Sequence, residues 1–140
     1  MASRDVFVDT SGLHALIDKR DANHAAAAAV VGKRIRTGCK LVVTDYVLDE
    51  TVTLAKARGG AHVALRVLEL LEQSVAIRIE WIGAERFTAT KMFLRKYVDH
   101  DYSFTDCTSF VVMRELGLRQ ALTSDRHFRE AGFETLLSVG

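Results

Sequence analysis

Proline is absent from the 140 residues, and cysteine occurs only twice. Helical patterns are therefore never interrupted by a residue that lacks a backbone N–H. Cys39 and Cys107 lack the close spacing of a zinc motif, and they predict reduced thiols in a cytoplasmic protein. Long hydrophobic runs are missing too: none approaches the ~20 residues that a membrane span needs. The apolar run that ends at Asp9 is also too short for a secretory signal, so we expect neither export nor a membrane partner.

A marked excess of charge of either sign is also lacking. The 19 Lys and Arg residues nearly balance the 18 Asp and Glu residues, giving a formal net charge of +1. Bulk electrostatics therefore neither require nor exclude a nucleic-acid partner. The five histidines show no i, i+4 pair, which excludes a helical zinc motif, and no glycine-rich phosphate-binding motif is present. The composition, 49% hydrophobic and 26% charged, is that of a globular protein, and we expect residues 1–140 to form one domain.

Short apolar runs alternate with longer helical patterns along the whole chain. The runs that predict strands are residues 4–8, 40–44, 75–82, 120–123 and 133–137. The predicted helices are residues 13–18, 24–36, 45–58, 61–73, 85–98, 105–116 and 126–131, and residues 9–12 are expected to be a turn. This alternation predicts an α/β protein: a three-layer α/β/α fold with a central, mainly parallel sheet of four or five strands.

Four acidic residues stand at the ends of predicted strands or the starts of predicted helices. Asp9 and Asp125 directly follow strands, whereas Glu50 and Asp106 fall in the first two turns of helices. Ligands of open α/β sheets bind outside the carboxyl ends of the strands. We therefore expect all four carboxylates to face one edge of the sheet.

Three of the four acids also have a purely structural interpretation. Asp9 and Asp125 suit helix N-caps, and Ser103 with Asp106 fits a capping box. Glu50 is more informative, because a helical wheel places it beside the apolar face while Asp49 points away to solvent. That apolar face consists of Val47, Leu48, Thr51, Leu54 and Ala55. A carboxylate half turned toward the core is unfavourable unless something pairs with it.

Gathered carboxylates need a counter-charge. Two like charges ~4 Å apart repel by roughly 4 kcal/mol at an effective dielectric constant of 20. A divalent cation would remove this repulsion, and oxygen ligands suit Mg²⁺ or Mn²⁺. Such ions activate water and stabilise the leaving oxygen of a phosphodiester, so the acids point to a nuclease.

Four segments together resemble the PIN-domain family and, within it, the VapC toxins of toxin–antitoxin pairs. They are VFVDTS (residues 6–11), TDYVLDETV (44–52), SFTDC (103–107) and LTSDRHF (122–128). Each is a weak signal alone, but their order and spacing within 140 residues are specific.

This resemblance implies an endoribonuclease that depends on Mg²⁺ or Mn²⁺. The implied catalytic and metal-binding residues are Asp9, Glu50, Asp106 and Asp125, with Thr10, Ser11, Asp101 and Thr105 in supporting roles. It also implies an RNA substrate, a homodimer and a small protein antitoxin. A free-standing PIN ribonuclease in RNA processing would carry the same acids.

Two other classes compete with a nuclease. A phosphoryl-transfer or phospho-acceptor domain also places an aspartate after its first strand, but here the position two residues later is Ser11 rather than an acid. A non-catalytic PIN-like module that binds RNA or protein is the other alternative, although all four acids are retained.

Two further patterns have both a functional and a structural interpretation. The basic clusters are Lys33, Arg34, Arg36 and Lys40, and Lys91, Arg95 and Lys96. Each could bind RNA phosphates or form a solvated face. The apolar stripe of the helix over residues 61–71 is expected to be core, with some of it available for a dimer contact.

Overall fold

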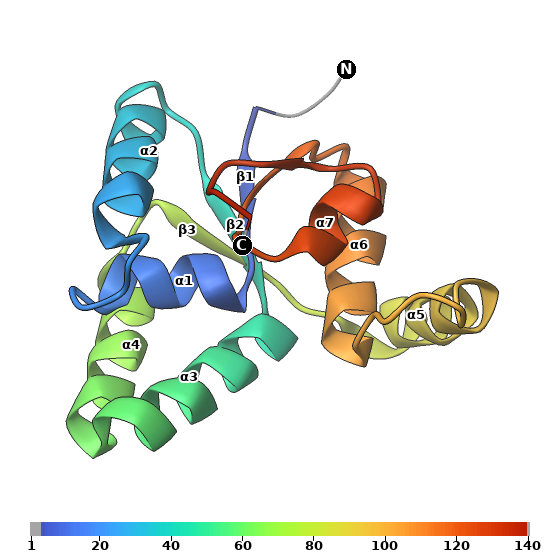
Figure 1. The fold of residues 1–140 in the computed structure, drawn as a ribbon, viewed down its shortest axis with the longest axis horizontal. Coiled ribbons are helices and arrows are strands. Elements are labelled where there is room, and N and C mark those ends of the chain that lie inside the picture. Colours follow the sequence, from blue (N-terminus) through green and yellow to red (C-terminus); the bar gives the residue numbers. More distant parts are fainter. Residues whose placement is uncertain (1–3, 140) are drawn as a thin grey trace.

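A computed structural model describes residues 4–139, which form a five-stranded, wholly parallel sheet between helices (Figure 1). The strands, in the order in which they lie side by side, are β3 (Ile77–Glu80), β2 (Leu41–Thr44), β1 (Val6–Val8), β4 (Gln120–Leu122) and β5 (Glu134–Thr135). The predicted α/β class and parallel sheet are confirmed.

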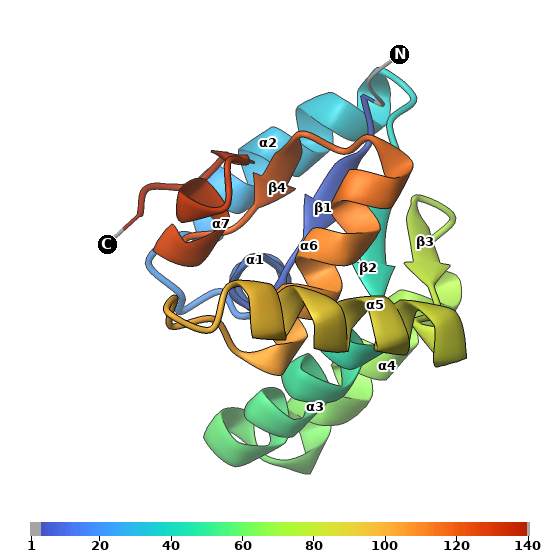
Figure 2. The same ribbon diagram turned by 90° about the vertical axis from the view of Figure 1, so that its right-hand side faces the viewer.

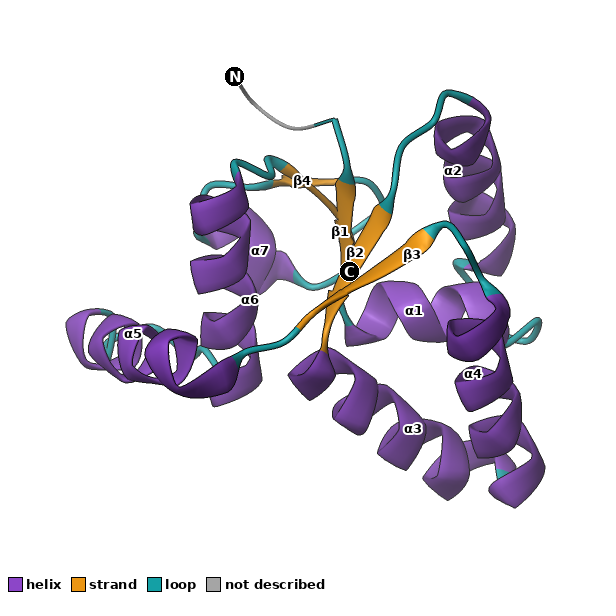
Figure 3. Cartoon of the chain, turned by 180° about the vertical axis from the view of Figure 1, so that it is seen from behind, coloured by secondary structure: helices purple, strands orange, loops and turns teal. Residues whose placement is uncertain are grey.

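Seven helices complete the layers in the part of the chain that the structure describes. They are α1 (Thr10–Ile17), α2 (His24–Arg36), α3 (Asp45–Gly59), α4 (Ala61–Gln73), α5 (Gly83–Lys96), α6 (Phe104–Leu116) and α7 (Arg126–Glu130). Helices α1 and α2 lie on one face of the sheet, and α6 and α7 lie on the other with α5 outside them (Figures 2 and 3). The α3–α4 hairpin projects beyond the carboxyl ends of the strands. None of the helices described is long and apolar enough to cross a membrane.

The alternation of side chains along the strands divides the core in two. Phe7 on β1 points to the same side as Val42 and Ala121, where Phe110 and Phe128 cover them. The opposite side holds the neighbouring strand residues Val6, Val8, Leu41, Val43 and Leu122 together with Leu13 of α1 and Ala27 of α2. Burial on both faces explains why these strands read as continuous apolar runs.

The strand order reverses beside β1. The chain runs outward from β1 through β2 to β3, and then returns to place β4 on the other side of β1. The register sets Phe7 opposite both Val42 and Ala121. Such a switch point opens a crevice at the carboxyl ends of the two strands, and this is where ligands of α/β sheets bind. Asp9 and Asp125 follow those two strands.

Some predicted boundaries were wrong. Helix α1 begins at Thr10 rather than at residue 13, because the carboxylate of Asp9 accepts a hydrogen bond from the Gly12 N–H and makes the expected turn the first helical turn. The strands β3 and β5 are shorter than expected, and α5 starts two residues earlier. On α4, Leu65 and Leu68 are 56% and 41% exposed, so the prediction that they belong to the core was wrong.

Candidate active site

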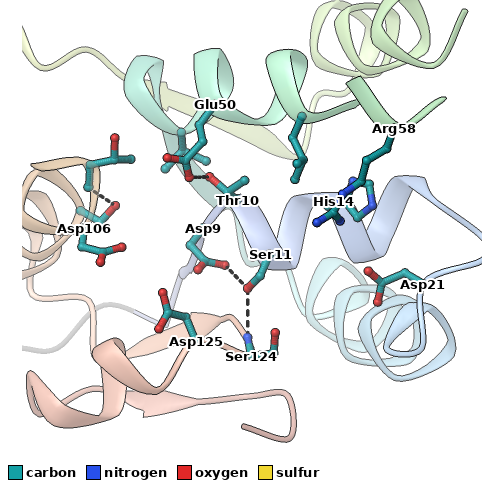
Figure 4. A pocket seen from close by; sticks show the side chains of 14 residues that line it. Asp9, Thr10, Ser11, His14, Asp21, Glu50, Arg58, Asp106, Ser124 and Asp125 are labelled. Atoms are coloured by element: carbon teal, nitrogen blue, oxygen red, sulfur yellow. Dashed lines mark hydrogen bonds between the residues drawn. The ribbon is translucent and has the colours of Figure 1, made fainter. Parts of the chain in front are cut away.

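A cleft of about 360 Å³ lies at the carboxyl edge of the sheet. All four acids singled out from the sequence lie in its wall, and they come from four different parts of the chain (Figure 4). The residues that line it are Asp9, Thr10, Ser11, His14, Asp21, Val47, Glu50, Leu54, Arg58, Thr105, Asp106, Ser109, Ser124 and Asp125. Three supporting residues, Thr10, Ser11 and Thr105, are among them, whereas the fourth, Asp101, is exposed and outside this wall.

Asp9 is the most deeply held of the four acids, with 6% of its surface exposed. One carboxylate oxygen accepts hydrogen bonds from the Gly12 N–H at 2.9 Å and from the Ser11 hydroxyl at 2.8 Å. The other accepts one from the Thr123 hydroxyl at 2.7 Å. Thr123 Oγ1 in turn accepts the backbone N–H of Asp125, so one threonine couples the ends of β1 and β4.

Burial has a large effect on the acidity of Asp9. Loss of solvation raises its pKa to about 7, and the charge of Asp125 adds to the rise. The hydrogen bonds from Gly12, Thr123 and Ser11 favour the carboxylate and oppose the increase. A divalent cation bound beside this carboxylate would favour its charged form and lower this pKa.

Asp106 and Asp125 each lie at the start of a helix and also face the cleft. Asp106 forms the predicted capping box of α6 with Ser103, and Asp125 caps α7 by accepting the His127 N–H at 2.9 Å. Burial raises the pKa of Asp106, and the neighbouring Asp125 contributes to the rise. Asp106 and Asp125 are therefore both capping residues and members of the cleft wall. The capping hydrogen bonds orient each carboxylate, and its remaining lone pairs are available to a ligand in the cleft.

Glu50 reaches the cleft from the second turn of α3. Its carboxylate accepts a hydrogen bond from the Thr10 hydroxyl at 2.5 Å, which joins α3 to the start of α1. Asp49, the adjacent acid, is exposed and absent from the cleft wall. Val47, Thr51 and Ala55 are buried, as the helical wheel predicts. The expectation that Glu50 is half turned toward the core was wrong: Glu50 is exposed like Asp49, and the two differ in that Glu50 lines the cleft.

His127 is a candidate ligand that the sequence analysis left unassigned. Its Nδ1 lies 3.2 Å from a carboxylate oxygen of Asp106 and 3.2 Å from one of Asp125. Both ring nitrogens are buried and make no hydrogen bond of good geometry with residues 4–139. Ligand atoms of these three residues all lie within 4.8 Å of one another, close enough for a shared ion. A buried imidazole with unsatisfied nitrogens beside two carboxylates fits a divalent cation.

The far end of the cleft has a different character. Figure 4 shows Arg58 and His14 at the end away from Asp106, with Asp21 opposite them. Arg58 comes from the last turn of α3, and no motif or pattern in the sequence singles it out.

A model of the PIN domain matches residues 6–134, which include every element that builds the cleft. The chain belongs to the PIN domain family. A relative from Mycobacterium tuberculosis, the 23S rRNA-specific endonuclease VapC20, is 36% identical over 130 residues, which are 91% of this chain and 95% of the relative. Ribonuclease VapC26 of the same organism is 30% identical over 124 residues, 88% of this chain and 89% of its own.

Solved structures agree with this assignment. The crystal structure of VapC20, described as a toxin that cleaves the sarcin–ricin loop, superposes with a TM-score of 0.81 at 32% identity and covers 95% of this chain and 99% of its own. The structure of FitAcB from Neisseria gonorrhoeae gives a TM-score of 0.66 at 13% identity and covers 93% and 95%. At that identity the second likeness concerns the fold alone.

Proposed function

We propose that the protein is a metal-dependent endoribonuclease that hydrolyses RNA phosphodiester bonds in this cleft. The observation that carries the proposal is the convergence of Asp9, Glu50, Asp106 and Asp125 from four separate elements on one cleft at the switch point of the sheet. Membership of the PIN domain family and the likeness to VapC endonucleases support the same chemistry.

Asp106, Asp125 and His127 place ligand atoms close enough to share a divalent cation, Mg²⁺ or Mn²⁺. Asp9 and Glu50 are not part of this close group but line the same cleft, and they would complete the site around the ion. Such an ion supplies charge neutralisation and activation of water for attack on phosphorus. The imidazole adds one nitrogen donor to a set that is otherwise oxygen, and this favours Mn²⁺ over Mg²⁺.

The surrounding hydroxyls act as positioning groups. Thr10 fixes the carboxylate of Glu50, Ser11 and Thr123 fix that of Asp9, and the Ser103 N–H fixes that of Asp106. Because these side chains are already ordered by hydrogen bonds, little reorganisation is needed when substrate enters.

The substrate we propose is structured ribosomal RNA, with the sarcin–ricin loop of 23S rRNA as the first candidate. The endonuclease VapC20 is named for 23S rRNA and shares 36% of its aligned residues with this chain. The activity would be that of a cytoplasmic toxin inhibited by a protein antitoxin. A free-standing PIN ribonuclease would show the same cleavage but would not arrest growth, so expression with and without the genomic neighbour separates the two roles.

We also propose a homodimer, supported by the exposed leucines of α4. Leu65→Glu with Leu68→Glu is expected to convert a dimer to a monomer, because burying these carboxylates in an apolar interface is unfavourable. Light scattering on wild type and variant measures the change. Glu69→Gln, on the same helix, is the control that should keep the dimer. A monomeric wild type would contradict the prediction.

The nuclease proposal is tested by cleavage of a sarcin–ricin stem-loop RNA with Mg²⁺ or Mn²⁺. Glu50→Ala should lower kcat by about a hundredfold or more, since it removes one ligand of the site. Asp49→Ala, which removes the adjacent exposed acid, should stay within about twofold of wild type, as surface changes usually do. Cleavage that persists in EDTA, or that is lost in Asp49→Ala and kept in Glu50→Ala, would reject the mechanism.

A further inference from the structure

We propose that the RNA strand leaves the acidic cleft past Arg58 and lies in a second, basic hollow whose cations bind the phosphates beside the scissile bond. This inference rests on the proposed function and adds to it the path of the substrate. The term basic hollow means the depression of about 440 Å³ lined by Ile17, Asp18, Lys19, Arg20, Arg58, Gly59, Val63 and Arg66.

The basic hollow adjoins the acidic cleft. Arg58 lines both, so a strand bound to the acids at one end of the cleft reaches this guanidinium and then the hollow. In Figure 4, Arg58 stands at the end of the cleft that is remote from Asp106. The walls come from the loop after α1 and from the facing ends of α3 and α4.

Most of the positive charges that line this hollow are not neutralised by a carboxylate of the described residues. Asp18 is the one carboxylate among its lining residues, and it is already paired with Arg20 at 3.2 Å and with His14 at 3.4 Å. Within residues 4–139, Lys19, Arg58 and Arg66 form no ion pair with any carboxylate. Three free cations beside an acidic catalytic cleft complement a polyanion whose scissile phosphate is held by metal and whose flanking phosphates need positive charge.

The lining of the hollow also includes apolar side chains. Ile17 and Val63 are half-buried and contribute apolar surface against which a ribose can pack. A basic groove that follows the phosphates is one element of single-strand binding sites.

The basic residues noted in the sequence lie elsewhere. Lys33 and Arg34, near the end of α2, line a depression together with Arg4 and Arg119. Arg4 precedes β1, Arg119 precedes β4, and α2 leads into β2. Because all strands are parallel, this depression is at the amino edge of the sheet, opposite the acidic cleft. It is too far from the acidic cleft to hold the phosphates next to the bond that is cut. Substitution of its cations therefore serves as a control that removes the same charge from another place.

The test compares two triple variants of the full chain. Lys19→Gln, Arg58→Gln and Arg66→Gln together remove the free cations of the basic hollow. Lys33→Gln, Arg36→Gln and Arg119→Gln together remove the same charge from exposed positions at or near the amino edge. Binding of a fluorescent sarcin–ricin stem-loop RNA is followed by anisotropy in EDTA over a series of salt concentrations, so that no cleavage occurs.

The hollow variant should raise Kd on the order of tenfold at ~0.1 M salt and lower the slope of log K against log salt by about 2, or about 0.7 for each lost contact. The control should remain within about twofold. In the metal-loaded enzyme, Lys19→Gln or Arg66→Gln alone should raise KM with little change in kcat, as expected when uniform binding is lost.

Equal losses in both variants, or an unchanged slope in the hollow variant, would overturn the proposal. So would a change in molar mass by light scattering, because the hollow would then be a contact between two copies of the chain. If wild type binds this RNA without cleaving it, the nuclease proposal fails. The anisotropy series would still show whether the bound RNA occupies the basic hollow. Circular dichroism and melting temperature confirm that each variant is folded.

Discussion

Asp9→Asn is expected to abolish RNA cleavage and, at pH 8 without divalent cations, to raise the melting temperature. Asn keeps an oxygen that can accept the Gly12 N–H, so the cap of α1 is retained. The substitution removes a buried negative charge that no cation compensates in the metal-free protein. Cleavage should fall by about a thousandfold or more, since the ligand is lost while the fold is stabilised.

The raised pKa of Asp9 also predicts how the stability of the metal-free protein changes with pH. The pKa of Asp9 rises from 3.8 to about 7 on folding, so between these values the unfolded chain releases a proton that the native protein retains. The free energy of unfolding of metal-free wild type should therefore fall as pH rises from about 4 to about 7, and level off above. A shift of this size corresponds to roughly 4 kcal/mol at most. Asp106, whose pKa is also raised by burial, contributes in the same direction.

Thermal unfolding between pH 5 and pH 8 in EDTA measures this dependence in wild type and variant. The slope should be much smaller in Asp9→Asn, and millimolar Mn²⁺ should stabilise wild type more than the variant at pH 8. Asp99→Asn, a change at an exposed loop aspartate outside the cleft, is the matched control and should behave as wild type. Identical pH dependence in Asp9→Asn and wild type would show that Asp9 is already compensated.

Gly12→Ala is expected to be among the most destabilising single changes in the protein. A Cβ on Gly12 would stand 1.9 Å from the carbonyl oxygen of Leu122, which is backbone and unable to rotate away. Helix α1 would have to move off β4, at a loss of about 3 kcal/mol or more in the free energy of unfolding. The same movement would separate Asp9 from Thr123, so cleavage should fall even at temperatures where the variant is folded.

Gly32→Ala on α2 provides the comparison. There the nearest atom to a new Cβ is the flexible end of Arg36 at 3.4 Å, and the change should stabilise the helix by about 0.5–1 kcal/mol. Chemical denaturation of both variants measures the difference. Similar effects at both glycines would contradict the close packing of α1 against β4.

Much of the fold follows from local pattern. The existence of the five strands, the exact α2 and α4 spans and the capping box at Ser103 could all be predicted, because each depends on neighbouring residues. The start of α1 could not. Its first turn contains Thr10, Ser11 and Gly12, which are typical of turns, and the Asp9 cap was one of two interpretations that the sequence left open. The cap makes this turn helical, and the absence of a side chain on Gly12 lets it pack against β4.

For the site, the position of the acids at one edge of the sheet could be predicted, as could the support of Asp9 by Ser11, whereas the roles of His127 and Arg58 could not. Asp9 and Asp125 follow strands, which the sequence displays directly. The approach of His127 to Asp106 depends on how α7 packs beside α6, and the sharing of Arg58 between two depressions depends on the angle of the α3–α4 hairpin. Both are consequences of tertiary packing, for which a single sequence carries no periodic signal.

Asp9 and Asp125 cap helices and Asp106 completes a capping box, so the choice of inactivating substitution matters for any later study of complexes. Alanine would remove a ligand and loosen the first turn of a helix together, so a lost interaction with RNA or protein would have two explanations. Asparagine keeps an oxygen that can cap the turn, while it removes the charge and replaces the other carboxylate oxygen by an amide NH₂. An asparagine-substituted chain is thus the form in which substrate or inhibitor can be trapped with the native backbone around it.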